Sequence, residues 1–187
     1  RNPWEVFRDV KFIGNTRVDP CSKVLKRDLL RSYIEEHFDP ADTTIVLGID
    51  WTEIHRLERA APRWLPWALW APLCEAPYVE KDDLLADLKV RNIDIPRLYT
   101  LGFPHNNCGG FCVKAGQAQF AKLLKEFPER YKRHEKEEAE TITVLGKDVS
   151  ILRDRRGGVT KPMTMKTFRE RLGKDNDNYD AEEWGGC

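Results

Sequence analysis

A short apolar segment, residues 44–49 (Thr-Ile-Val-Leu-Gly-Ile), predicts a β-strand that is buried on both faces. A nearly continuous run of apolar and β-branched residues is typical of a parallel sheet that helices cover on both sides. A second apolar run, residues 67–73, predicts a neighbouring strand whose length Pro72 limits. Because predicted helices alternate with these strands, we expect an α/β fold: a doubly wound, mostly parallel sheet followed by a helical C-terminal region.

Helices are predicted where apolar residues recur three or four positions apart. The first begins at Asp19-Pro20, a favourable helix start, and extends to Phe38, packed on a core. Further helices are predicted over residues 54–61, 81–90, 115–127, 129–140 and from Thr164 onward. Residues 1–20 are expected to be irregular. We therefore expect an α/β domain over residues 1–125 and a charged, helical extension over 126–187 with a flexible tail.

The composition fits a globular protein, because 41% of the 187 residues are hydrophobic and can build a core. The 31 basic and 31 acidic residues balance, which removes the simplest argument for a nucleic-acid binder but leaves room for a local basic patch. No apolar run approaches the ~18 residues of a membrane span. No secretory signal opens the chain. We expect a cytoplasmic protein that does not bind membranes.

Five cysteines are the most informative feature of the composition. An odd number fits a disulfide framework poorly, because one thiol would be left over. All five lie within two residues of a glycine or a proline, and thiols at loop positions suggest ligands or nucleophiles more than core packing. The alternative is a set of unrelated, reduced thiols. The cysteines are Cys21, Cys74, Cys108, Cys112 and Cys187.

The segment from Gly102 to Cys112 combines several groups that could carry chemistry. Cys108 and Cys112 flank two glycines, so their thiols can turn towards one point and hold a metal or an iron–sulfur cluster with other thiolates. Cys21 stands at a predicted helix N-terminus, where the helix dipole would lower its pKa and suit it to be a ligand or a nucleophile. His105 could ligate, donate a proton or only cap the loop.

Basic residues form three candidate anion sites, and each also has an explanation that needs no bound ligand. Arg56 and Arg59 share a helix face suited to phosphate or sulfate, although Glu53 could instead pair with Arg56 as on an ordinary surface helix. Lys26 could meet an anion or only face solvent. A basic turn before Gly157-Gly158 could contact a polyanion or be an ordinary charged turn; it comprises Arg153, Arg155 and Arg156.

Two segments resemble a known family. Residues 19–26 (Asp-Pro-Cys-Ser-Lys-Val-Leu-Lys) are similar to the cysteine-plus-basic helix start of PAPS-reductase-like proteins, in the adenine nucleotide alpha-hydrolase (PP-loop ATP pyrophosphatase) superfamily. Residues 93–112 resemble that family's succession of proline, leucine-tyrosine, glycine-aromatic and cysteine pair. The two motifs occur in the same order about 85 residues apart, and the match covers roughly residues 15–125. Residues beyond about 140 resemble a phage and actinobacterial branch.

The resemblance implies a nucleotide-binding sheet and a [4Fe–4S] cluster held by Cys21, Cys108 and Cys112, with Cys74 or Cys187 as the fourth ligand. It implies sulfur transfer or sulfonucleotide reduction on an adenine nucleotide, ATP or PAPS-like, with a sulfur or electron donor protein as partner. A nucleic acid is a further candidate partner. The residues expected to act are Cys21 and His105 in catalysis, and Lys26, Arg56, Arg59 and Glu53 in substrate binding.

The chain departs from the family pattern at three places. Its cysteine pair has one extra intervening residue, Cys21 is followed by Ser22 where reductases have a second cysteine, and the phosphate loop Ser-Gly-Gly-x-Asp-Ser is absent. We expect that loop upstream of Arg1, or the activity to be lost. The alternative function is a non-catalytic module with structural zinc in a nucleic-acid or phage-associated assembly. A cysteine-nucleophile hydrolase is a third hypothesis.

Overall fold

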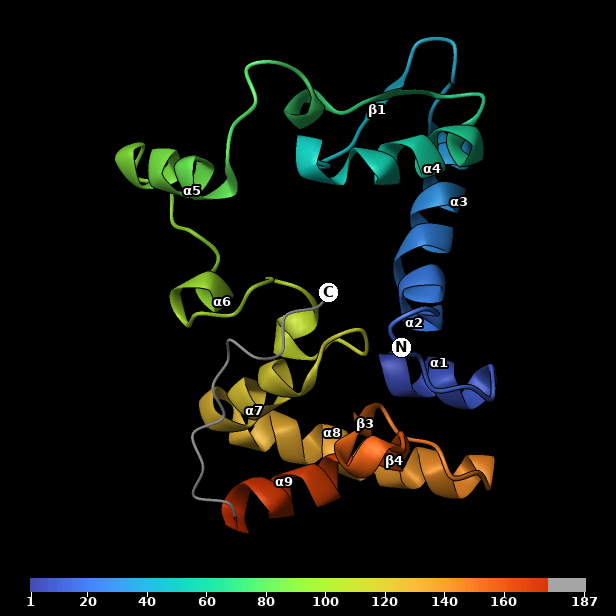
Figure 1. The fold of residues 1–187 in the computed structure, drawn as a ribbon. Helices are drawn as coiled ribbons and strands as arrows, with labels where there is room; N and C mark the ends of the chain where they lie inside the picture. Colours follow the sequence, from blue (N-terminus) through green and yellow to red (C-terminus); the bar gives the residue numbers. More distant parts are fainter. Residues whose placement is uncertain (175–187) are drawn as a thin grey trace. The chain divides into compact units, whose positions relative to one another are not determined.

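Figure 1 shows the computed structural model, which describes residues 1–174. Helices predominate in that part of the chain, and its strands form two separate two-stranded sheets. The backbone gathers into two compact units, of which Leu30–Ile95 is the second and the remainder the first. The first unit therefore joins the segment that holds Cys21 to the segment that holds Cys108 and Cys112.

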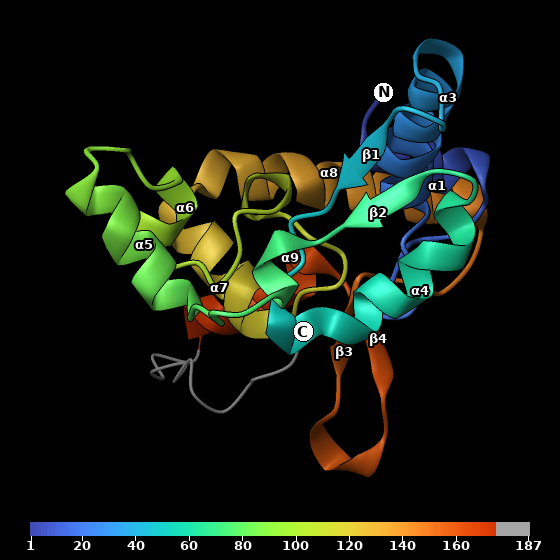
Figure 2. The same ribbon diagram turned by 90° about the horizontal axis from the view of Figure 1, so that it is seen from above.

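The first unit consists of helices and one β-hairpin. Its helical elements are α1 (Pro3–Asp9), α2 (Pro20–Ser22), a π-helical turn (Lys23–Arg27), α6 (Arg97–Thr100), a 3-10 turn (Cys108–Gly110), α7 (Gln117–Glu126), α8 (Pro128–Leu145) and α9 (Met165–Lys174). The strands β3 (Leu152–Asp154) and β4 (Lys161–Met163) pair antiparallel around a 3-10 turn (Arg156–Gly158). Figure 2 shows this hairpin projecting away from α7, α8 and α9.

The core of the first unit includes α1, which the sequence analysis missed. Asn2 accepts hydrogen bonds from the backbone N–H groups of Trp4 (2.9 Å) and Glu5 (3.0 Å), and Glu5 accepts one from Asn2 N–H (2.7 Å). This capping box, with Pro3 in the first turn, begins the helix. Trp4 and Phe7 are buried. The expectation of an irregular segment over residues 1–20 is therefore wrong for α1.

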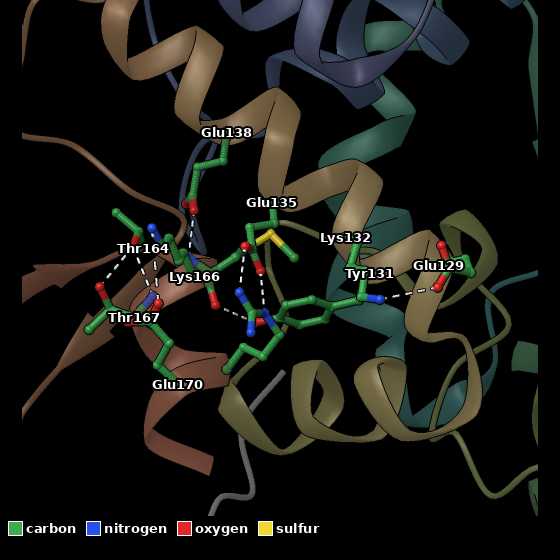
Figure 3. A network of polar contacts seen from close by, with 11 residues as sticks. Glu129, Tyr131, Lys132, Glu135, Glu138, Thr164, Lys166, Thr167 and Glu170 are labelled. Carbon is green, nitrogen blue, oxygen red and sulfur yellow. Dashed lines mark hydrogen bonds and ion pairs between the residues drawn. The ribbon is translucent and has the colours of Figure 1, made fainter. Parts of the chain in front are cut away.

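Hydrogen bonds to two glutamate carboxylates, one buried and one half-buried, connect the hairpin and α9 to α8. Glu138 of α8 accepts hydrogen bonds from the backbone N–H groups of Ile151 (3.0 Å) and Met165 (2.5 Å). One turn earlier, Glu135 forms two hydrogen bonds with the guanidinium of Arg169, at 2.8 and 2.9 Å (Figure 3). These contacts give the hairpin and α9 a defined position on α8.

The second unit has little core of its own. Its elements are most of α3 (Asp28–His37), β1 (Thr44–Val46), a 3-10 turn (Trp51–Glu53), α4 (Ile54–Trp64), β2 (Ala68–Trp70), a 3-10 turn (Pro72–Cys74) and α5 (Lys81–Val90). Strands β1 and β2 pair in parallel, with Ile45 opposite Leu69. Its buried apolar side chains are Ile34, Trp67 and Ala71.

The predicted doubly wound α/β fold is wrong. The two parallel strands exist, but each has three residues and pairs only with the other among the described residues. One face of the pair is left uncovered: Val46 is 57% and Trp70 48% exposed, and the opposite Ile45 and Leu69 are only half-buried. The predicted packing of the helix that ends at Phe38 is also wrong, because Leu29 and Leu30 are more than half exposed. The apolar runs indicated strand formation correctly, but they did not specify how many strands would join.

Several predicted helices are confirmed. Helix α5 begins and ends at the expected residues, and the helix start at Asp19-Pro20 is present. Thr164 precedes α9, and its hydroxyl accepts a hydrogen bond from Thr167 N–H (3.1 Å). The division of the chain at residue 125 stays a prediction. The predicted flexible tail and Cys187 lie outside the described residues.

Candidate functional site

Three cysteines whose positions suggested a shared site are brought together in the first unit. Cys21 lies in α2, Cys108 begins a 3-10 turn, and Cys112 follows that turn. Each of the three thiols interacts electrostatically with the other two, and Cys108 and Cys112 also share a hydrogen bond. Cys21 and Cys108 are 87 positions apart in the sequence. The fold therefore brings cysteines from residues 19–26 and from residues 93–112 into the same unit.

A left-handed turn sets the direction of the cysteine pair. Cys108, Gly109 and Gly110 have φ values of 51°, 61° and 89°, a region that favours glycine. A Cβ on Gly110 would lie 3.1 Å from Phe103 and 3.2 Å from Leu123, both buried. The Gly110 carbonyl accepts a hydrogen bond from Gln119 Nε2 (2.9 Å). Packing therefore explains the second glycine of the pair.

The stacked rings of Phe111 and His134 support the cysteine turn. Phe111 lies on the His134 ring of α8, with ring centroids 3.7 Å apart and planes 8° apart. Trp4 Nε1–H donates a hydrogen bond to His134 Nδ1 (2.9 Å), which requires an unprotonated Nδ1. Burial, together with smaller effects of the positive charges on Arg133 and Arg130, lowers the pKa of His134 to about 4. A neutral imidazole therefore supports the residue next to Cys112.

The sequence analysis did not identify His134 or Trp4 as part of this site. They are 130 positions apart, and nothing in the spacing of either residue indicates the other. The one available signal was the capping box at Asn2 and Glu5, which marks α1 as a helix and places Trp4 in its first turn.

The thiols differ in electrostatic environment. The Cys108 hydrogen bond lowers the pKa of Cys112 to about 6, with help from Lys114 and from backbone N–H groups, against the effect of burial. The same bond raises the pKa of Cys108, which acts as the donor. Burial raises the pKa of Cys21. The predicted lowering at Cys21 is therefore wrong, because desolvation outweighs the Ser22 N–H group at a helix of one turn.

Positive charges lie around the cysteine turn. The Lys26 ammonium, carried on the π-helical turn after Cys21, acts electrostatically to lower the pKa of Cys108. The Arg130 guanidinium donates a hydrogen bond to the Gly109 carbonyl and lies 4.7 Å from the Phe127 ring centroid. The Lys122 ammonium lies 5.8 Å from the Phe103 ring centroid. These cations attract anions, although burial and the shared hydrogen bond still keep the pKa values of Cys21 and Cys108 raised.

The thiols form a donor set but not a preformed site for one metal ion. Within residues 1–174, no group of three or more histidine, cysteine, aspartate or glutamate side chains has a geometry that would hold a metal ion. A cluster requires less convergence, because its cysteine sulfurs bind different irons. Sulfur donors are the ligands that iron–sulfur clusters and structural zinc use. The donor chemistry therefore fits either group.

The other predicted site residues have separate surroundings. His105 is exposed, and its side chain forms no hydrogen bond with the described residues. In the second unit, Cys74 donates a hydrogen bond to the Ile49 carbonyl (3.2 Å), and Glu53 forms an ion pair with Arg56. This ion pair agrees with the interpretation of Glu53 and Arg56 as partners on an ordinary surface helix rather than as an anion site. Arg59 is exposed and has no ion pair within the described residues.

Comparisons with protein-family models, with curated proteins and with solved structures find no match for this chain. No helix among residues 1–174 has the length and apolar character needed to span a bilayer.

Proposed function

We propose that this chain belongs to a PAPS-reductase-like protein in which Cys21, Cys108 and Cys112 are ligands of a [4Fe–4S] cluster. The reaction would be sulfur transfer or sulfonucleotide reduction on an adenine nucleotide. One observation supports this function most strongly: the three thiols interact with one another although they come from two motifs far apart in the sequence.

The surroundings of the thiols support the same proposal. Cysteine thiolates and the clusters they hold carry negative charge, and the ammonium of Lys26 reaches Cys108 electrostatically. The ring of His134 is neutral near pH 7 and supports the turn through packing rather than through charge. Cys74 or Cys187 would be the fourth ligand. A bound cluster would supply electron transfer or sulfur coordination at this point.

Lys26 is the strongest candidate for contact with an anionic substrate near the thiols. Its charge acts on Cys108, and none of the described residues forms an ion pair with it. In the second unit, Arg59 is a further candidate for binding an anion, because it is exposed without an ion pair in the described chain, whereas Glu53 already offsets part of the charge of Arg56. Cys21 and His105 remain the proposed catalytic residues.

Metal analysis of anaerobically purified protein tests the cluster. We expect iron and acid-labile sulfide together with the broad visible absorption of an iron–sulfur protein. Colourless protein with one zinc per chain would contradict the cluster and favour the alternative, a structural zinc module. The position of Cys108 and Cys112 in one tight turn is the observation that favours this alternative, since zinc needs its sulfurs close together.

Binding of PAPS and ATP, measured by calorimetry, tests the nucleotide. We expect Lys26→Ala to weaken PAPS binding about tenfold, because a charge-assisted contact is lost. Lys125→Ala removes an exposed charge from α7 and is the matched control. Equal affinity in both variants would contradict the role of Lys26, and no binding to the unaltered protein would contradict the nucleotide.

A further inference from the structure

The positive charge of this chain is concentrated in one continuous segment. The chain as a whole has 31 basic and 31 acidic residues, but residues 153–174 contain eight basic and two acidic ones. This excess of six positive charges is matched by an equal acidic excess elsewhere. The basic residues are Arg153, Arg155, Arg156, Lys161, Lys166, Arg169, Arg171 and Lys174.

The segment folds into the β3–β4 hairpin and α9, which together we name the basic hairpin–helix surface. Residues 155–162, which form the end of the hairpin, are all exposed. Gly157 and Gly158 have φ values of 73° and 76°, and open space surrounds both. Figure 2 shows the end of the hairpin standing clear of α7, α8 and α9. A narrow ribbon with an unobstructed tip can enter a groove on a partner.

An open pocket of about 280 Å³ lies between the hairpin and α9. Arg171 of α9 donates a hydrogen bond to Asp154 (2.7 Å), and Arg156 lies 3.5 Å from the other oxygen of that carboxylate. Asp154 thus orients two guanidinium groups. The pocket is lined by Arg156, Thr167, Glu170, Arg171 and Lys174. The three cations of the lining outnumber the two nearby carboxylates, Glu170 and Asp154, so the space carries a net positive charge that favours an anion.

Three cations of the surface are not used by the fold. Arg155, Lys161 and Lys174 are exposed and form no ion pair with any residue in the described part of the chain. By contrast, Arg169 is held by Glu135, and Lys166 lies 4.0 Å from Glu170. Cations that stabilise no internal contact are available for a partner.

We infer that the basic hairpin–helix surface binds the phosphate backbone of a double-stranded nucleic acid. Arginine binds phosphate bidentately, and a two-stranded ribbon is narrow enough to enter a groove of a duplex. A lipid surface fits less well, because Val159 is the only large apolar side chain exposed within residues 152–174, and membrane-binding faces need several. The inference does not depend on the cysteine site.

Fluorescence anisotropy with a labelled duplex of about 20 base pairs tests this inference on the full chain, with salt varied from about 0.05 to 0.2 M. The test variant is Arg155→Ala with Lys161→Ala, which removes no described ion pair. Its matched control is Arg133→Ala with Lys125→Ala, which removes one exposed arginine and one exposed lysine from α8 and α7.

We expect the test variant to bind the duplex about tenfold more weakly, and its log–log salt slope to fall by roughly 2, since each lost phosphate contact changes that slope by ~0.9. The control variant should bind like the unaltered chain. Equal losses in both variants, or no loss in the test variant, would overturn the inference. Tighter binding to polyglutamate or to phosphatidylserine vesicles than to the duplex would overturn it in favour of an acidic protein or a membrane.

Discussion

At the residue scale, two adjacent glycines in the cysteine turn face different neighbours. A Cβ on Gly109 would lie 2.8 Å from the end of the flexible Arg130 side chain, whereas one on Gly110 would press on the buried Phe103 and Leu123. Both glycines have positive φ. Substitution of Gly109 therefore measures mainly the cost of the left-handed backbone conformation, whereas substitution of Gly110 adds the cost of overpacking the core.

We therefore expect Gly110→Ala to destabilise the protein by about 3 kcal/mol and Gly109→Ala by about 1 kcal/mol. The larger value adds overpacking in the core to the left-handed penalty. Urea denaturation of both variants measures this difference. Equal destabilisation would mean that Phe103 and Leu123 do not constrain the turn.

Glu138 makes stability depend on pH in an unusual direction. Burial raises its pKa to about 7 from 4.5, although hydrogen bonds from Met165 and Ile151 N–H oppose the shift and the nearby Glu135 carboxylate adds to it. The native state therefore holds this proton more tightly than the unfolded chain. The resulting stability is fully present below about pH 4.5 and is lost as the pH rises through about 7.

We expect the free energy of unfolding to fall by up to about 3 kcal/mol from this group between about pH 4.5 and 8. Glu138→Gln removes the titration and leaves one backbone N–H facing the amide NH₂ group, so the variant should be less stable at pH 5 (about 1–3 kcal/mol) but have a flatter profile. Urea denaturation across the pH range compares the two proteins. Parallel profiles would contradict a titrating Glu138.

Residue patterns predicted part of this site and not the rest. Cys21, Cys108 and Cys112 could be singled out because loop position and motif order are properties of the sequence. Their pKa values could not be ranked from the sequence, because the ranking depends on burial and on which thiol donates the shared hydrogen bond. Desolvation is a property of the folded chain.

At the scale of elements, α1 contributes to the site through a single hydrogen bond and a stack. Trp4→Phe keeps an aromatic ring but removes the donor to His134 Nδ1, which would leave a half-buried acceptor unpaired. We expect a loss of about 1–3 kcal/mol in stability, measured by urea denaturation.

The same substitution at Trp70 is a matched control, because its Nε1–H donates a hydrogen bond to the exposed Glu75 carboxylate (2.9 Å). Water can replace that partner, so Trp70→Phe should cost within about 0.5 kcal/mol. If both variants lost the same stability, the Trp4–His134 bond would not be a specific support of the cysteine turn.

Elements were easier to predict than their packing. Helix α5 and the start of α2 were found from caps and apolar spacing, which are local properties. The strands at Thr44 and Ala68 were also indicated, but full burial was inferred from composition alone. A larger sheet would need further strands from distant parts of the sequence. The apolar character of one run does not show whether such strands exist.

At the scale of the whole molecule, the two units differ in how much apolar surface they bury. The first unit has a core of buried aromatic and aliphatic residues, including Phe120, Leu123 and Phe168. The second buries Ile34, Trp67 and Ala71 and exposes many other large apolar side chains. Local stability follows the number of buried contacts, so the units should open independently.

We expect amide hydrogen exchange in α4 and α5 to be faster than in α7 and α8 by on the order of 100-fold or more. Helices α4 and α5 contain no buried residue, whereas α7 and α8 contain several. Exchange followed by mass spectrometry of peptides measures each unit separately. Equal protection would contradict the assignment of a weaker core to residues 30–95.

The iron and acid-labile sulfide content of anaerobically purified protein decides whether three thiols share one inorganic centre. The unaltered chain is compared with Cys108→Ser, and circular dichroism verifies that the helices of the variant are intact. We expect Cys108→Ser to lose most of its iron and sulfide, because the remaining thiols would lack a ligand that the turn places beside Cys112. A folded Cys108→Ser protein with full iron and sulfide would contradict the shared centre.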